Sequence, residues 1–148
     1  METIDLVRAA VSATAFAALY AGHYLGDQWV QTAAQACKKS LDRPGAQAAE
    51  AHWHCFKHVF TYTLGGLALF LLAAAWLDLP VRPGWLAAGL AVNAISHYVV
   101  DLRTPLFWLA KKIGRMGYIE HCQVVRPTGA EKVGPGTGSF HLDQAWHF

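Results

Sequence analysis

The chain has 148 residues, of which 54% are hydrophobic and only 15% are charged. Soluble domains carry about 25% charged residues, so this composition argues against an ordinary soluble protein. The formal net charge of +2 is not accompanied by a basic-aromatic motif, and we therefore expect no nucleic acid partner. The three cysteines lack the spacing of a disulfide framework or a zinc knuckle.

Three stretches without Asp, Glu, Lys or Arg predict membrane-spanning helices: residues 9–26, 59–77 and 83–100. Each has 18 or 19 residues, and about 20 are needed to cross the roughly 30 Å hydrocarbon layer. The fold class that we expect is all-α. It is a polytopic membrane bundle of three spanning helices with a C-terminal partial or interfacial helix, in one membrane domain over residues 1–148.

Proline and glycine positions suggest where the helices begin and end. Pro83 suits the first turn of a helix, and Pro105 should break the helix that precedes it. The expected elements are, in chain order, a first helix over about residues 4–38, a second over about 46–79, a third over about 83–104, a cytoplasmic connector over 106–138, and the start of a C-terminal helix over 139–148.

Basic residues predict the orientation of these helices. If all three segments span, the side that holds the first connector and everything after the third helix carries nine of the twelve Lys and Arg residues. The opposite side carries two, and Lys57 lies near the start of the second helix. Since an excess of Lys and Arg marks cytoplasmic loops, we expect the N-terminus to lie outside.

Histidine and aspartate residues form four pairs in which the partners are four positions apart: His23/Asp27, His54/His58, His97/Asp101 and Asp143/His147. Residues four apart share one face of a helix, so each pair can offer two ligands to one point. On the predicted topology all four pairs lie at the same depth, on the cytoplasmic side. Imidazole and carboxylate ligands suit a divalent metal, zinc first, with iron and manganese as alternatives.

We therefore predict that all eight paired residues are metal ligands. The candidate catalytic carboxylates are Asp27, Asp101 and Asp143, with Asp27 or Asp143 as general base if it does not bind metal. Gln28 and Gln144 each follow one of these aspartates and could orient it by hydrogen bonding. Lys57 is interpreted either as an anion contact or as an interfacial side chain. Three further histidines are expected in loops or at the interface: His52, His121 and His141.

The ordered motifs resemble a known family. HYLGDQWVQ begins at His23, the pair His54/His58 follows, HYVVD begins at His97, and DQAWH begins at Asp143. Over nearly the whole chain this order resembles the bacterial membrane-protein family catalogued as domain of unknown function 3307, which implies a bacterial inner membrane location. Members of that family continue after the last motif into another apolar helix, whereas this sequence ends at Phe148.

A more distant similarity, through the HxxxD pair and the Thr104-Pro105 that follows it, is to membrane-bound metal-dependent hydrolases of the phospholipase-like kind. The leading hypothesis is a metal-dependent hydrolase that acts on a lipid, a phosphoester or a membrane-embedded bond at the cytoplasmic interface. One alternative is a non-catalytic protein, either a metal-stabilised scaffold or an ion or proton pathway; another is a haem-binding bundle. Membrane lipid is the expected partner, no particular protein partner is indicated, and a homo-oligomer is compatible with the sequence.

Overall fold

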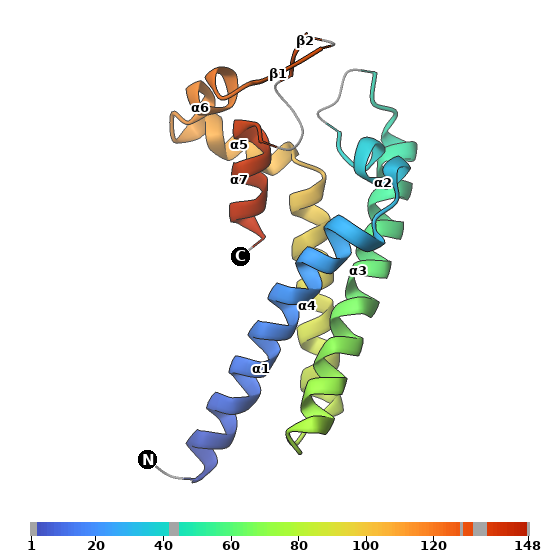
Figure 1. Ribbon diagram of the computed structural model, residues 1–148, viewed down its shortest axis with the longest axis vertical. Helices are drawn as coiled ribbons and strands as arrows, with labels where there is room; N and C mark the ends of the chain where they lie inside the picture. The colour runs from blue at the N-terminus through green and yellow to red at the C-terminus, as the bar shows by residue number, and fades with distance from the viewer. Residues whose placement is uncertain (1–2, 42–44, 128, 132–135, 148) are drawn as a thin grey trace.

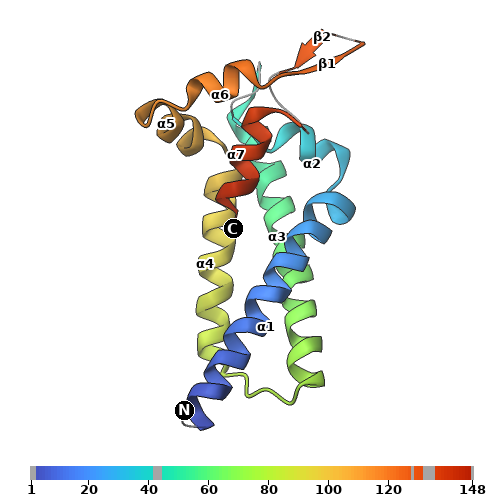
Figure 2. The same cartoon turned by 60° about the vertical axis from the view of Figure 1, so that its left-hand side comes forward.

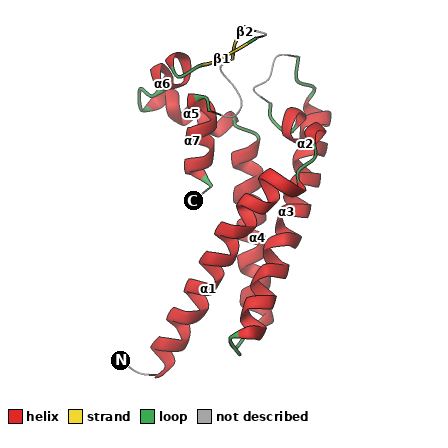
Figure 3. Cartoon of the chain, in the orientation of Figure 1, coloured by secondary structure: helices red, strands yellow, loops and turns green. Residues whose placement is uncertain are grey.

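The computed structural model describes residues 3–41, 45–127, 129–131 and 136–147. Within these ranges the chain is almost entirely helical, and a short antiparallel hairpin is its one sheet (Figures 1 and 3), which confirms the all-α fold class. The elements are, in chain order, α1 (Thr3–Leu25), the π-helical turn η1 (Gly26–Val30), α2 (Ala33–Lys38), α3 (Ala48–Trp76), α4 (Pro83–Asp101), α5 (Thr104–Lys112), α6 (Met116–His121), β1 (Val124–Arg126), β2 (Gly129–Glu131) and α7 (Gly138–Trp146).

The long helices have the length and composition of membrane spans. Two stretches, Ile4–Val30 and Ala48–Trp76, are long and apolar enough to cross a membrane. A third qualifies if α4 and α5, which meet at a 70° bend, are counted as one span. Large apolar side chains are exposed on these helices, with Leu72 and Val92 each at 69%. Hydrocarbon tails are a favourable environment for such faces, so the described chain is a polytopic membrane bundle.

The helix α3 lies at the centre of the bundle, with contacts to both α1 and α4 (Figures 1 and 2). Glycines bring α1 against α3: a β-carbon at Gly22 would lie 3.0 Å from the Gly66 Cα atom, and one at Gly26 would lie 2.7 Å from Cδ2 of Tyr62. Small residues of this kind let helix backbones approach closely in membranes, where no hydrophobic effect drives helices together. The crossing fixes the end of α1 against the middle of α3.

The helix expected over residues 4–38 is divided into three elements. After η1, Gln31 has an extended backbone with φ −63° and ψ 127°. Thr32 then caps a new helix: its hydroxyl accepts from the Gln35 amide (3.2 Å), while the Gln35 side chain accepts from the Thr32 amide (2.7 Å). This reciprocal cap satisfies helix-end donors and favours a helix start at this point. As a result, α2 folds back against α3.

The third helix ends at Asp101, because Arg103 adopts a left-handed backbone conformation (φ 60°) and a new helix begins at Thr104 with Pro105 in its first turn. The expected connector is itself structured, as α5, α6 and the hairpin. Thr137 caps α7 by accepting a hydrogen bond from the Phe140 amide (3.3 Å). α7 runs back from this end of the molecule toward the bundle, so its C-terminal end lies beside α4 (Figure 2).

Candidate metal centre

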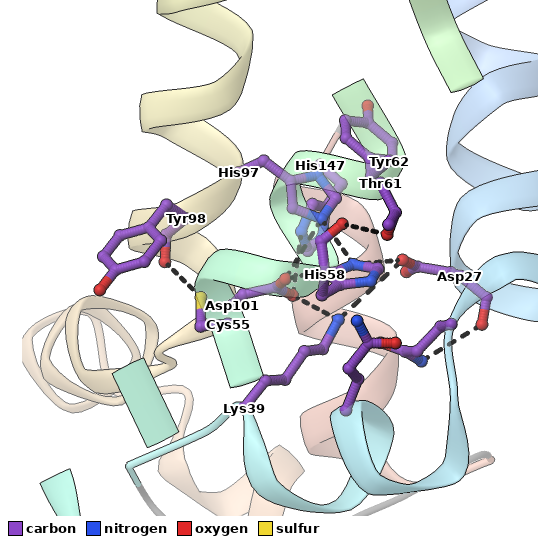
Figure 4. Close-up of polar contacts among 12 residues, drawn as sticks. Asp27, Lys39, Cys55, His58, Thr61, Tyr62, His97, Tyr98, Asp101 and His147 are labelled. Carbon is purple, nitrogen blue, oxygen red and sulfur yellow. Dashed lines mark hydrogen bonds and ion pairs between the residues drawn. The ribbon is translucent and has the colours of Figure 1, made fainter. Parts of the chain in front are cut away.

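Six side chains converge where the spanning helices end, and Figure 4 labels all of them except His23. They are His23 of α1, Asp27 of η1, His58 of α3, His97 and Asp101 of α4, and His147, which directly follows α7. Their side chains are between 0% and 8% exposed. Six of the eight residues predicted as metal ligands are therefore gathered at one buried point.

The donor atoms of three residues are spaced as ligands of one metal ion would be. The Nε2 atoms of His58 and His97 lie 3.1 Å apart, and they lie 3.4 Å and 3.2 Å from Oδ2 of Asp101. Oδ1 of Asp27 lies 3.0 Å from the same His58 nitrogen. In a tetrahedral site, bonds of about 2.0–2.1 Å place ligand atoms roughly 3.3–3.4 Å apart. These side chains could therefore close on a single ion with small movements.

Hydrogen bonding alone does not account for this arrangement. His58 Nε2 has three neighbours within 3.4 Å, namely one oxygen of Asp27, one oxygen of Asp101 and the ring nitrogen of His97. An ionised carboxylate only accepts, and a ring nitrogen carries at most one hydrogen. If both nitrogens donate to the two carboxylate oxygens, no hydrogen is left for the 3.1 Å contact between the nitrogens themselves. A cation among these lone pairs would satisfy all of them at once.

His147 has the hydrogen-bond arrangement of a typical histidine ligand. Its Nδ1 donates to the carbonyl oxygen of Asp143 (2.8 Å), which directs Nε2 toward the cluster, 3.6 Å from Oδ1 of Asp101. The ring lies beside those of His23 and His97, with centroids 4.7 Å and 4.4 Å away. Burial is the largest single influence and lowers the pKa of His147, but Asp101 and Asp143 together outweigh it, so the pKa lies above its ordinary value.

A second possible ligand group, His23, Asp27 and His97, adjoins the first and shares His97 with it. Gln144 of α7 joins two of its members: its Oε1 lies 3.2 Å from Nε2 of His23, and its amide nitrogen donates to Asp27 (3.5 Å). This position matches the orienting role predicted for Gln144. Gln28, for which the same role was predicted, is exposed on η1.

Asp143 and His54 lie outside both ligand groups found among the described residues, as does His147. Unlike His147, neither side chain contacts a member of these groups through an ion pair or hydrogen bond given above. Oδ1 of Asp143 lies 3.4 Å from Nε of Arg103, so this carboxylate holds α7 to the turn between α4 and α5. Asp143 and His147 are four residues apart, which on a helix is a rise of about 6 Å. Because the C-terminal end of α7 is the end nearest the cluster, His147 lies within the cluster and Asp143 lies outside it. His54 is half-buried on α3, one turn before His58.

Lys39 is the site residue that sequence reasoning missed. Its Nζ lies 2.8 Å from Oδ1 of Asp101 and 4.0 Å from Oδ1 of Asp27, and its side chain is 7% exposed. No sequence pattern distinguishes it from its neighbour Lys38, which pairs with Glu50 and is 44% exposed. Histidine binds a metal in its neutral form, so in a metal site the two carboxylates and one ammonium would leave a net charge of −1. That charge favours a further cation.

The other polar residues singled out in the sequence lie away from the cluster. Nζ of Lys57 lies 5.2 Å from the ring centroid of Trp53, a cation–π contact. Nδ1 of His52 is hydrogen-bonded to the hydroxyl of Tyr98 (2.7 Å). His52, His121 and His141 are all exposed.

No family model, no curated protein and no solved structure matches this chain. The resemblance to domain of unknown function 3307 therefore stays a prediction. The function is therefore inferred from the side chains of the cluster and their geometry.

Replacing Lys39 tests the electrostatics of the cluster. In buffer with a chelator, Lys39→Met should lower the stability of the protein by about 3–5 kcal/mol, because Asp101 is left as a buried, uncompensated charge. The matched control, Lys38→Met, should cost about 0–1 kcal/mol, since its ion pair is exposed. Thermal unfolding in mild detergent, followed by circular dichroism, measures both. Equal losses in the two variants would contradict the buried pairing of Lys39.

Proposed function

We propose that this protein is a membrane metalloenzyme, a hydrolase whose divalent ion is held by His58, His97 and Asp101. The spacing of their three donor atoms, 3.1–3.4 Å within a buried cluster, is the observation that carries the proposal. Asp27 and His147 are the next ligands within reach. The mixture of imidazole and carboxylate favours zinc, with iron and manganese as alternatives.

Individual residues would have different roles at such a metal site. A bound ion would act as a Lewis acid and lower the pKa of a water molecule beside it. Lys39 holds the Asp101 carboxylate by a 2.8 Å ion pair and supplies positive charge next to the site. Asp27 is the best-placed general base if it does not bind the metal, because Gln144 and His58 orient its two oxygens separately.

The depth of the site favours a substrate at the membrane surface. The cluster lies at the ends of the spanning helices, where lipid headgroups and the first turns of membrane helices lie. A lipid, a phosphoester or a membrane-anchored chain can reach this depth. Lys39 would suit an anionic substrate group.

A non-catalytic, metal-stabilised scaffold is the second candidate, and the near-complete burial of the ligands favours it. His58 is 0% exposed and Asp101 1%, whereas a catalytic site keeps an open position. A measurement of substrate hydrolysis by the purified protein distinguishes the hydrolase from the scaffold. A haem between facing histidines is disfavoured, because Nε2 atoms 3.1 Å apart leave no space for a macrocycle between His58 and His97.

Metal content is the first test. Protein purified in mild detergent should retain zinc, iron or manganese at a molar ratio of about one or two, by plasma mass spectrometry. His97→Ala should lower this content about 10-fold or more, because His97 belongs to both ligand groups. Two controls should keep it: His121→Ala on the surface, and Asp143→Asn, whose carboxylate faces Arg103. Equal metal in all variants, or none in the wild type, would refute the metal centre.

Catalysis is tested with Asp101→Asn, which keeps the shape of the side chain and removes its charge. Vesicles of radiolabelled phosphatidylethanolamine and phosphatidylglycerol serve as substrate, and chromatography of the products measures turnover. We expect a loss of about 100-fold or more, while helix content stays close to normal. Asp143→Asn should retain most of the activity. Turnover that Asp101→Asn leaves unchanged would refute the metalloenzyme, and a metal-loaded wild type without turnover would favour the scaffold.

The third test concerns orientation, for which we propose that the cluster faces the cytoplasm. Cys37 is exposed on α2, next to the cluster. A membrane-impermeant maleimide added to intact cells should therefore leave Cys37 unmodified until the membrane is opened. Modification of Cys37 from outside would move the site to the opposite face.

A further inference from the structure

Helices α1 and α4 both pack on α3 (Figure 2). An apolar groove runs along the bundle between α1 and α4. It has a volume of about 220 Å³ and runs from the loop at residues 80–82, which precedes α4, to Asn93 within the spanning segments. We call it the α1–α4 groove and define it by six of its lining residues: Ala15, Leu19, Leu67, Leu86, Gly89 and Asn93. Hydrocarbon surrounds the helices along most of the length of the groove, so an apolar lipid chain or ligand would fill it favourably.

The groove leads to the metal centre. A second hollow, of about 140 Å³, shares Leu19 and Asn93 with the groove and is lined by Tyr62 and His147 on its other side. The ring of Tyr62 stacks on His97, with the centroids 4.0 Å apart. The two hollows thus adjoin at Leu19 and Asn93, and the second one reaches His147 at the edge of the cluster.

Asn93 is a polar residue at the junction of the groove and this second hollow. Its Oδ1 accepts a hydrogen bond from the hydroxyl of Tyr62 (3.4 Å). Its amide nitrogen is buried and has no acceptor among the residues that the structure describes. Buried donors are rarely left unsatisfied, and such a group points to a missing partner. A carbonyl oxygen lying at the end of the groove would supply that partner.

We propose that the α1–α4 groove binds an acyl chain of a membrane glycerophospholipid, with its ester carbonyl on Asn93 and its phosphate at the metal centre. In such a lipid the acyl chain, the ester carbonyl and the phosphate follow one another. The groove, Asn93 and the cluster follow one another in the same order along the bundle. This inference rests on the proposed function, whose substrate class it narrows to phospholipids.

The dimensions and charges agree with this occupant. Gly89 and Trp85 line the groove below Asn93, and the eight residues from Trp85 to Asn93 rise about 12 Å. The four residues from Asn93 to His97 rise about 6 Å more. A chain in the groove thus runs into the hydrocarbon layer, which is roughly 30 Å thick. At the other end, a bound divalent ion would change the net charge of the cluster from −1 to +1, which would suit a phosphate.

Gly89 allows the groove to be filled without disturbing the helices. A β-carbon there would meet no atom within 4 Å, and the residue lines the groove. Gly65 of α3 supplies the matched control: a β-carbon there also meets nothing within 4 Å, but Gly65 is not among the groove's lining residues. Gly89→Leu and Gly65→Leu therefore differ mainly in whether the groove is blocked. Asn93→Leu removes the amide donor while keeping a similar size.

The probe is phosphatidylglycerol with a photoreactive diazirine in one acyl chain, at trace level in phosphatidylethanolamine vesicles that contain the purified protein. Mass spectrometry maps the crosslinks. In the wild type, crosslinks at groove residues should disappear when unlabelled phosphatidylglycerol is added in excess, whereas crosslinks at the outward face, such as Val92, should fall only with dilution. Gly89→Leu should reduce the saturable labelling at least 5-fold, and Asn93→Leu should require about 5–10-fold more lipid for saturation. Gly65→Leu should match the wild type.

Metal content, measured on the same samples, separates the failure of this inference from that of the proposed function. Normal metal with no saturable labelling, or equal labelling in Gly89→Leu and Gly65→Leu, would overturn the groove as a lipid site. Saturable groove labelling in a protein without metal would support lipid binding and overturn the metal centre. Normal metal, lost labelling and lost phospholipid turnover in Gly89→Leu would support both.

Discussion

Two carboxylates, Asp27 and Asp101, are buried among imidazoles at one end of an apolar bundle, and a buried charge is unfavourable unless a partner lies beside it. Lys39 is that partner. Had the first helix continued straight, Lys39 would lie about 18 Å beyond Asp27 along its axis. The π-helical turn and the cap at Thr32 reverse the chain instead and bring the ammonium to within 4.0 Å of Asp27. The π-helical turn η1 and the helix α2 thus position the ammonium that compensates the two buried carboxylates.

The need to compensate these buried carboxylates also explains the position of α7. Its C-terminal end inserts His147 beside Asp101, and its Gln144 contacts His23 and Asp27. The ion pair of Arg103 with Asp143 then fixes α7 to the turn after α4. Each of these contacts joins segments far apart in the sequence. Together they close the cluster on the side away from the spanning helices, where α2 and α7 both lie (Figures 1 and 2).

Below the cluster, the packing of the helices is determined by their hydrocarbon surroundings rather than by buried charges. Large apolar side chains such as Leu72 face outward, while the contact of Gly22 with Gly66 holds α1 to α3. Since α1 and α4 both pack on α3, a groove stays open between them and ends at Asn93. An apolar groove beside a buried cluster of histidines and aspartates is an arrangement suited to a molecule with an apolar tail and a polar head.

The sequence by itself determined the features that depend on local periodicity. Uncharged runs predicted the long helices, and the four-residue spacing placed His23 with Asp27, and His97 with Asp101, because residues four apart share a helix face whatever the fold. Only the tertiary structure decided which pairs enter the site. His147 enters while Asp143 turns to Arg103, and Lys39 is buried while the adjacent Lys38 stays at the surface. Those outcomes depend on where α2 and α7 dock, and docking is set by contacts between distant segments that no local pattern encodes.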